Sequence, residues 1–140
     1  MGARPKRPLS VRLRIETLRR LQQRSKELGE TQTALVERYV EQGLRTDAHP
    51  LIYFREGAGG RRPALVGTRL DVAQVIETIR QNGNSMAAAA DYLGLPIERV
   101  EACLRYYADH QEETEEWLQR ARATAEREES SWRRQQELLA

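Results

Sequence analysis

Residues 9–44 read LSVRLRIETLRRLQQRSKELGETQTALVERYVEQGL, and the spacing of the apolar residues changes once along this segment. The apolar residues first alternate with polar or cationic ones, at Leu9, Val11, Leu13 and Ile15. Period two is typical of a strand with one apolar face. The spacing then becomes helical, at Leu18, Leu21, Ser25 and Leu28, and Gly29 is expected to end that helix. A second helix, capped by Thr31 or Thr33, follows with its own apolar stripe at Leu35, Val36, Tyr39, Val40, Gly43 and Leu44.

A strand and two helices in about 45 residues cannot bury enough surface to be stable alone. The strand also lacks a partner strand in its own part of the chain. We therefore expect two copies to pair their strands as an antiparallel ribbon, giving a homodimer or a higher even oligomer. The predicted fold class is mainly α with small β elements: this ribbon-helix-helix at residues 1–46, a hairpin with a helix-turn-helix-like domain at 47–110, and a helical tail at 111–140.

The polar face of the predicted strand favours DNA binding. Residues 1–30 carry nine Lys/Arg and three Asp/Glu, an excess that attracts a polyanion. A two-stranded ribbon fits the major groove, where its side chains reach base edges. The predicted base-reading residues are Ser10, Arg12 and Arg14, and the predicted phosphate contacts are Arg4, Lys6, Arg7, Thr31 and Thr33. The alternative is a solvated edge strand, whose charges discourage aggregation.

The middle of the chain predicts a hairpin followed by helices. Thr46–Pro50 is expected to be a linker, and residues 51–55 and 64–70 to be strands around a long glycine-rich loop. Asp71 and Gln74 form a capping-box pattern, and Ser85 and Pro96 begin two further helices. The expected buried residues are Val72, Val75, Ile76, Ile79, Ile97, Val100, Leu104 and Tyr107, with Cys103 packed beside them. Glu98 and Glu101 disfavour a DNA-reading role for the last of these helices, so a scaffold or partner-binding role is favoured.

Residues 109–140 are helix-prone and acidic, with five Lys/Arg against nine Asp/Glu. Tryptophan on a polar helix is a preferred anchor for a protein partner. The predicted partner-binding residues are Trp117, Leu118, Ala121 and Trp132. The glutamates would suit a basic surface of the partner. The alternatives are a solvated helix, or packing of Trp117 on the middle domain.

Several classes of protein are disfavoured. One cysteine excludes an internal disulfide framework and a CxxC zinc site, and no apolar run approaches the roughly 20 residues of a membrane span. The beginning of the chain lacks the apolar region of a signal peptide, so a soluble cytoplasmic protein is expected. His49 and His110 have no second ligand at metal-binding spacing and are expected to be ordinary surface residues. We expect no catalytic residues, no metal and no cofactor.

Residues 9–44 resemble the ribbon-helix-helix (CopG/Arc-like) DNA-binding family in the strand SVRL, the leucines of the first helix and GETQT before the second. The resemblance implies a dimer whose ribbon enters the major groove, with Ser10 and Arg12 as base readers and Thr31 to Thr33 as a phosphate clamp. One position departs from the pattern: the first reader falls on Pro8, which offers no polar side chain, and Arg7 is a possible substitute.

Residues 51–110 resemble a second family, the bacterial domain of unknown function 433. The matching text is GGRRPALVGTRLDV and LGLPIERVEACLRYYADHQEE, with the shared pattern at Gly60, Pro63, Gly67, Thr68, Arg69, Val72 and residues 106–110. This resemblance implies a winged-helix-like fold and commonly a VapB-like type II antitoxin, encoded beside a PIN-like nuclease toxin.

The sequence leaves three hypotheses. The first is a dimeric antitoxin that binds double-stranded operator DNA, represses its own operon and neutralises a PIN-like ribonuclease toxin. The second is a stand-alone ribbon-helix-helix regulator whose C-terminal part oligomerises or binds another partner. The third is an adaptor whose basic beginning binds RNA or a membrane, although membrane binding favours an amphipathic basic helix over an alternating strand.

Overall fold

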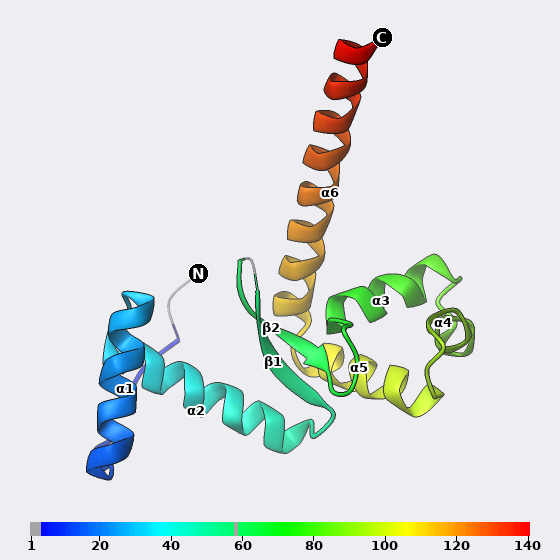
Figure 1. Cartoon of the computed structure of the whole chain (residues 1–140). Coiled ribbons are helices and arrows are strands. Elements are labelled where there is room, and N and C mark those ends of the chain that lie inside the picture. Colours follow the sequence, from blue (N-terminus) through cyan, green and yellow to red (C-terminus); the bar gives the residue numbers. More distant parts are fainter. Residues whose placement is uncertain (1–3, 58) are drawn as a thin grey trace. The chain divides into compact units, whose positions relative to one another are not determined.

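The computed structural model of the chain describes residues 4–57 and 59–140. Two compact units are present, an N-terminal unit (residues 1–43) and a C-terminal unit (residues 44–140), and each is described by itself. The elements follow the order α1 (Ile15–Leu28), α2 (Gln32–Ala48), β1 (Ile52–Gly57), β2 (Gly60–Leu65), α3 (Val72–Gln81), α4 (Met86–Leu93), α5 (Ile97–Asp109) and α6 (Gln111–Leu139) (Figure 1). The predicted class, mainly α with small β elements, is confirmed. The predicted domain boundaries at residues 46 and 110 stay predictions.

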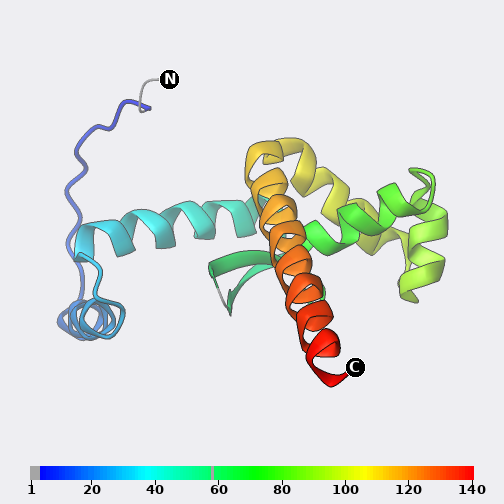
Figure 2. The same ribbon diagram turned by 90° about the horizontal axis from the view of Figure 1, so that it is seen from above.

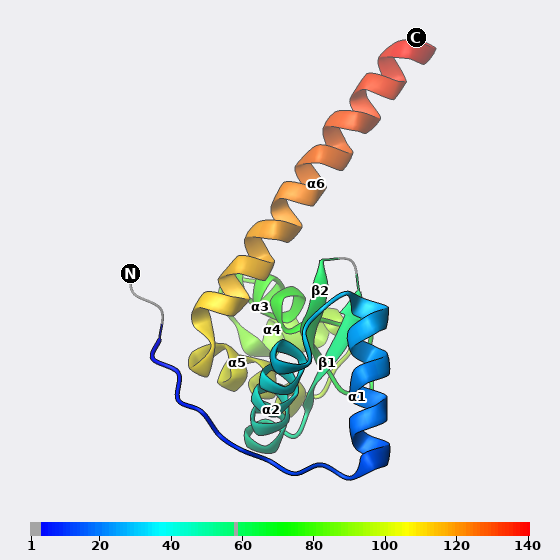
Figure 3. The same ribbon diagram turned by 90° about the vertical axis from the view of Figure 1, so that its left-hand side faces the viewer.

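The predicted strand at Leu9–Ile15 is wrong for the single chain. Residues 4–14 form no regular secondary structure, and α1 already begins at Ile15 (Figure 3). The physical reason is that a strand is stabilised by hydrogen bonds to a neighbouring strand, and the structure holds one chain. The segment leads into α1 as an extended trace.

The helical part of the N-terminal unit follows the prediction closely. Gly29 ends α1 in the left-handed conformation, at φ +64°, and its N–H donates to the Lys26 carbonyl. The Thr31 hydroxyl accepts a hydrogen bond from the Ala34 N–H at 3.1 Å, so Thr31 rather than Thr33 caps α2. Helix α2 continues to Ala48, so the predicted linker at Thr46–Pro50 is wrong for its first three residues.

The described part of the N-terminal unit buries almost nothing. Leu35 is its one buried side chain, and α1 has none. The apolar side chains that stay exposed in this unit are Leu9, Val11, Leu13, Ile15, Leu18, Leu28, Val36, Tyr39 and Val40. Leu9 is 85% exposed and Ile15 69% exposed. The N-terminal unit therefore does not bury these apolar side chains within itself.

The hairpin of the C-terminal unit is tighter than predicted. Strand β1 pairs antiparallel with β2, and Gly57 lies opposite Gly60, so the predicted long loop at residues 57–63 is wrong. Gly59 and Gly60 adopt φ +86° and +116°, which only glycine adopts readily, and this allows a short connection. Pro63 is accommodated within β2 because a two-stranded sheet leaves one edge of each strand open. The second strand ends at Leu65, not at residue 70, because a turn at Gly67 follows.

Helices α3, α4 and α5 pack behind the hairpin around one core. The buried residues of this core are Ile52, Leu65, Val72, Ala73, Val75, Ile76, Ile79, Ala89, Ala90, Val100, Cys103, Tyr106 and Leu118. The four residues predicted on α3 are all buried. On α5 the prediction is confirmed for Val100, which is fully buried, and Cys103 packs beside it as expected. Leu104 and Tyr107 are only partly buried, and Tyr106 is the fully buried tyrosine instead. Ile97, predicted to be buried, is 36% exposed.

Helix α6 joins this core only through its first two turns. Thr114 and Leu118 are buried, and Leu118 belongs to the core of the C-terminal unit. Beyond this point the helix extends away from α3, α4 and α5, while α4 lies at the opposite end of α3 and α5 (Figures 1 and 2). None of the helices in the described ranges is long and apolar enough to cross a membrane.

Candidate functional site

The residues predicted to contact DNA lie on an open segment of the N-terminal unit. Ser10, Arg12 and Arg14, the predicted base readers, are exposed, as are the predicted phosphate contacts Arg4 and Arg7. Lys6 is also exposed, and its ammonium lies 3.0 Å from a carboxylate oxygen of Glu37 on α2. Both partners are more than half exposed, so this ion pair stabilises little and can open for a phosphate.

The beginning of α2 carries the other predicted phosphate contacts. Thr31 is the helix cap, and Thr33 in the first turn is exposed. Since a capping hydroxyl satisfies one of the unpaired N–H groups of a first turn, other N–H groups there remain for an anion. The Glu30 carboxylate precedes this end of the helix, but it lies 2.9 Å from the Arg38 guanidinium, which partly neutralises its negative charge.

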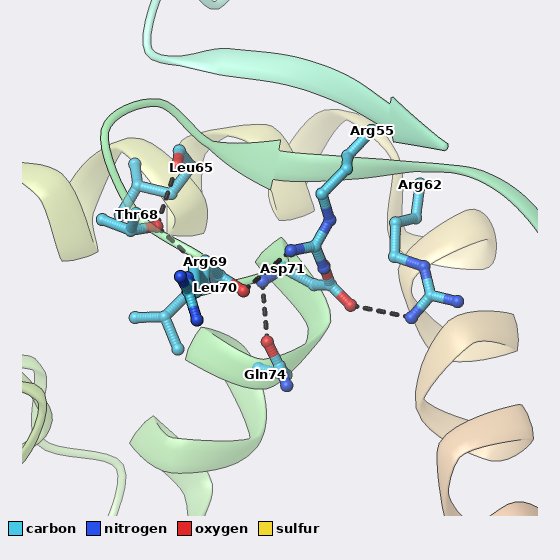
Figure 4. A network of polar contacts seen from close by, with 8 residues as sticks. All are labelled: Arg55, Arg62, Leu65, Thr68, Arg69, Leu70, Asp71 and Gln74. Atoms are coloured by element: carbon cyan, nitrogen blue, oxygen red, sulfur yellow. Dashed lines mark hydrogen bonds and ion pairs between the residues drawn. The ribbon is translucent and has the colours of Figure 1, made fainter. Parts of the chain in front are cut away.

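A polar network holds the hairpin to the beginning of α3 (Figure 4). The buried carboxylate of Asp71 accepts hydrogen bonds from Arg55 of β1 and from Arg62 of β2, the latter at 3.0 Å. The Asp71 N–H donates to Gln74 Oε1 at 2.8 Å, which confirms the predicted capping box. Asp71 therefore joins both strands to α3.

The Thr68 hydroxyl completes the same corner. It donates to the Leu65 carbonyl at 2.8 Å and accepts from the Leu70 N–H at 3.0 Å, so it stabilises the turn after β2. Arg69 contributes its carbonyl, which accepts from Arg55 at 3.0 Å, while its side chain is exposed. These contacts give Thr68 and Asp71 of the GTR-x-D sequence a structural role, whereas Arg69 takes part only through its backbone.

A second cluster joins the end of α2 to α5 and α6. Arg45 donates to the Tyr106 hydroxyl at 3.0 Å and pairs with Glu113, and the Tyr106 hydroxyl donates to Glu113 at 2.6 Å. His49 lies 2.8 Å from an Asp109 carboxylate oxygen and packs edge-on against the Tyr106 ring.

Burial changes the ionisation of this cluster. Burial, together with hydrogen bonding to Glu113, raises the pKa of Tyr106. Burial and the nearby positive charge of Arg45 lower the pKa of His110, which favours its neutral imidazole. The prediction that both histidines are ordinary surface residues is wrong, because both rings pack against Tyr106. Within the described residues no group of three or more potential ligands could hold a metal ion.

The Trp117 side chain packs against other residues of the C-terminal unit. The ring is partly buried against the core, with the Arg62 and Arg120 guanidinium carbons each 4.8 Å from its centroid. Such cation–π contacts add to the packing. Trp117 and Leu118, predicted to bind a partner, are thus largely covered by the C-terminal unit; their partner-binding role stays a prediction.

The rest of α6 together with the final residue, Ala140, is called the free half (residues 119–140). Every residue in it except Ser131 is exposed, including the predicted partner-binding residues Ala121 and Trp132, the latter 59% exposed. Near its beginning, Arg122 lies 3.2 Å from Glu77 of α3. An open groove runs between α3 and the free half, and its lining includes Gln74, Thr78, Tyr92, Ala121, Thr124 and Ala125.

The charge of α6 is divided unevenly along the helix. Residues 111–118 contain four glutamates and no arginine, whereas the free half contains five arginines and four glutamates. Glu113 and Glu115 already pair with Arg45 and Arg80 of the same unit. The acidic character that favoured a basic partner surface therefore belongs mainly to the packed beginning of the helix.

Sequence reasoning found the Asp71 capping box but missed the two arginines that converge on it, since residues 55, 62 and 71 are brought together only by the hairpin register. It also missed the Arg45, Tyr106 and Glu113 cluster. The helical spacing of Tyr106 and Glu113, seven residues apart across the α5–α6 junction, was the one local signal available.

The middle of this chain is a two-stranded hairpin followed by three helices packed around one core. Residues 52–107, which run from β1 into α5, match the family model described as Protein of unknown function (DUF433). The chain thus carries a DUF433 domain in this region, which confirms that part of the resemblance seen in the sequence. Neither the curated proteins nor the solved structures contain a significant match to the chain.

Proposed function

We propose that this protein binds double-stranded operator DNA as a homodimer and represses transcription. The observation that carries the proposal is the apolar surface of the N-terminal unit, which one chain leaves exposed while a cationic segment lies beside it. Pairing of residues 9–14 between two copies would supply the missing strand partner and bury that surface, as in the ribbon-helix-helix family. The ribbon would then present Ser10, Arg12 and Arg14 to base edges.

Replacement of Arg12 by alanine is expected to weaken specific DNA binding by about 1–3 kcal/mol and to broaden base preference, because one bidentate base contact is worth this much. The measurement is a titration of operator and scrambled duplexes by fluorescence anisotropy.

Lys6→Ala is the matched control, because Lys6 is placed as a phosphate contact. This variant is expected to weaken all duplexes similarly and to reduce the slope of log K against log salt by about one. Equal, sequence-independent losses for both variants would show that residues 10–14 do not read bases.

The antitoxin hypothesis is a second candidate, favoured by the free half of α6, which presents Trp132 away from the core. In this proposal a PIN-like nuclease toxin is the partner, and no enzymatic activity or cofactor is required of this chain. Co-expression with a neighbouring gene that encodes such a nuclease, followed by co-purification, tests the candidate.

Deletion of residues 119–140 tests the toxin-binding role of the free half and leaves Thr114 and Leu118 in the core. If the free half binds a toxin, this deletion is expected to leave operator binding intact and to abolish protection of cells from the toxin. Trp132→Ala should weaken the toxin complex by more than about 1 kcal/mol. Full protection by the truncated protein would exclude the free half as the toxin site.

A further inference from the structure

The five arginines of the free half divide into two sets by their contacts. The Arg122 guanidinium lies 3.2 Å from a carboxylate oxygen of Glu77, and the Arg133 guanidinium lies 2.6 Å from one of Glu129. The other three form no ion pair with a carboxylate in the part of the chain that the structure describes. They are Arg120, Arg127 and Arg134.

The three arginines without an ion pair follow one another at intervals of seven residues. Seven residues are almost two full turns of an α-helix, so residues at this spacing lie along one face. We call this row of Arg120, Arg127 and Arg134 the cationic stripe. All three side chains are exposed. The row is about 21 Å long, because each residue of an α-helix adds about 1.5 Å.

The glutamates of the free half lie on other faces of the helix. With about 100° of rotation per residue, none of the four comes closer than about 60° to an arginine of the stripe. They are Glu126, Glu128, Glu129 and Glu137. The stripe begins one turn after Glu116, and Thr124 and Ser131 lie between its arginines. The free half has nearly balanced charge as a whole, but this face presents positive charge and hydroxyl groups.

The hairpin fixes the first arginine of the stripe in place. The Arg120 guanidinium carbon lies 4.8 Å from the centroid of the Trp117 ring, and its Nη1 lies 3.5 Å from the Gly59 carbonyl oxygen. A guanidinium has five N–H donors, so donors remain after these contacts. Further along, the Arg127 guanidinium donates to the Thr124 hydroxyl at 3.4 Å, while the helix extends away from α3, α4 and α5 (Figures 1 and 2).

The composition of the stripe fits the phosphates of a nucleic acid. Arginine, serine and threonine supply many of the contacts that proteins make to DNA phosphates. Over about 21 Å a duplex passes about six phosphates on each strand, so each arginine can meet one. A protein partner would instead need a large apolar anchor. Between Arg120 and Arg134 the bulky apolar side chain is Trp132, which lies more than about 100° round the helix from the stripe.

We propose that the cationic stripe binds the phosphate backbone of double-stranded DNA without reading its sequence. The choice of a duplex rests on the proposed operator binding, which brings DNA to the same protein. Residues 10–14 would distinguish one sequence from another, whereas the stripe adds affinity for any duplex. Deletion of residues 119–140 would then lower the affinity for every duplex, and the preference for the operator would persist.

The test compares two double variants of the full-length chain that lose the same charge from the same helix. Arg127→Gln with Arg134→Gln removes two arginines of the stripe. Arg122→Gln with Arg133→Gln is the matched control, because these two arginines already pair with glutamates. Glutamine has a helix propensity close to that of arginine, and circular dichroism checks that the helices are kept. The measurement is anisotropy titration of an operator duplex and a scrambled duplex of equal length over a series of salt concentrations.

The stripe variant is expected to bind both duplexes about tenfold more weakly at physiological salt. The slope of log K against log salt should fall by about two for each copy whose stripe touches the duplex, and the ratio of the two affinities should not change. The control variant should stay within about twofold of the unchanged chain. Arg127→Lys with Arg134→Lys is expected to keep most of the affinity, because lysine also binds phosphate.

Two results would overturn the proposal. Equal losses for the stripe variant and its control would show that the net charge of α6 affects DNA binding and the stripe does not. Unchanged binding of both duplexes by the stripe variant would exclude DNA, and loss of toxin protection or of single-stranded RNA binding by that variant would then assign the stripe to a protein or to RNA.

The base-reading proposal is tested separately by Arg12→Ala. If that variant kept its base preference while the stripe variant lost affinity and salt slope, base reading by residues 10–14 would be wrong and the DNA contact of the stripe would be retained. If Arg12→Ala lost base preference while the stripe variant matched its control, only the stripe proposal would be wrong.

Discussion

Leu13→Asp is expected to abolish the homodimer and operator binding together. In the proposed ribbon the Leu13 side chain faces the core shared by two copies, although it is 43% exposed in the single chain. Burial of a carboxylate without a partner costs several kcal/mol, so the dissociation constant of the N-terminal pairing should rise by more than about 100-fold. Sedimentation equilibrium and anisotropy titration measure the two losses, in a chain truncated after residue 118 to remove the proposed DNA contact of α6.

Thr17→Asp is the matched control for this prediction. Thr17 is an exposed polar residue on α1, so the same carboxylate there should leave the dimer intact. A Leu13→Asp chain that remained dimeric, or a monomer that still bound its operator with full affinity, would contradict the two-copy arrangement of the N-terminal unit.

Asp71→Asn is expected to lower the free energy of unfolding of the C-terminal unit by about 2–3 kcal/mol. Loss of one partner of a buried ion pair typically costs about 3–5 kcal/mol, and the partial exposure of Arg55 and Arg62 reduces that figure. The amide cannot neutralise two guanidinium groups, so the hairpin loses its two ion pairs with the beginning of α3. Thermal unfolding followed by circular dichroism should show a midpoint lower by about 10 °C.

The control is Glu56→Gln, which removes an ion pair of the same hairpin. Glu56 lies 3.3 Å from Arg61 and is half exposed, so the expected loss is below about 0.5 kcal/mol. An unchanged midpoint for Asp71→Asn would show that the network of Figure 4 contributes no net stability and that packing alone holds the hairpin.

Local signals predicted much of the secondary structure because their causes are local. Gly29, Thr31, Asp71 and Ser85 act within one turn of backbone, and each ends or caps a helix as expected. The strand at residues 9–15 failed for the opposite reason, since its hydrogen-bond partners would come from another molecule. The glycine-rich segment up to Pro63 predicts a long loop and a late start of β2, whereas the two strands already pair at Gly57 and Gly60.

The candidate sites also differ in whether the sequence shows their cause locally. The cationic segment could be found from charge and alternation alone, although its contacts stay a prediction. The position of Trp117 could not be predicted, because an aromatic residue on a polar helix is explained equally well by an unknown partner or by the same chain. Here Arg62, more than fifty residues earlier, packs over the ring and favours the second explanation.

The two tryptophans determine what the intrinsic fluorescence of this protein can report. Trp117 is held against two guanidinium groups in the C-terminal unit, and Trp132 faces solvent on α6. The sequence places no tryptophan in residues 1–43. An emission change during denaturation therefore follows the loss of the DUF433 domain and α6, while the N-terminal unit contributes no tryptophan signal. A single smooth fluorescence transition would thus be no evidence that the two units unfold together.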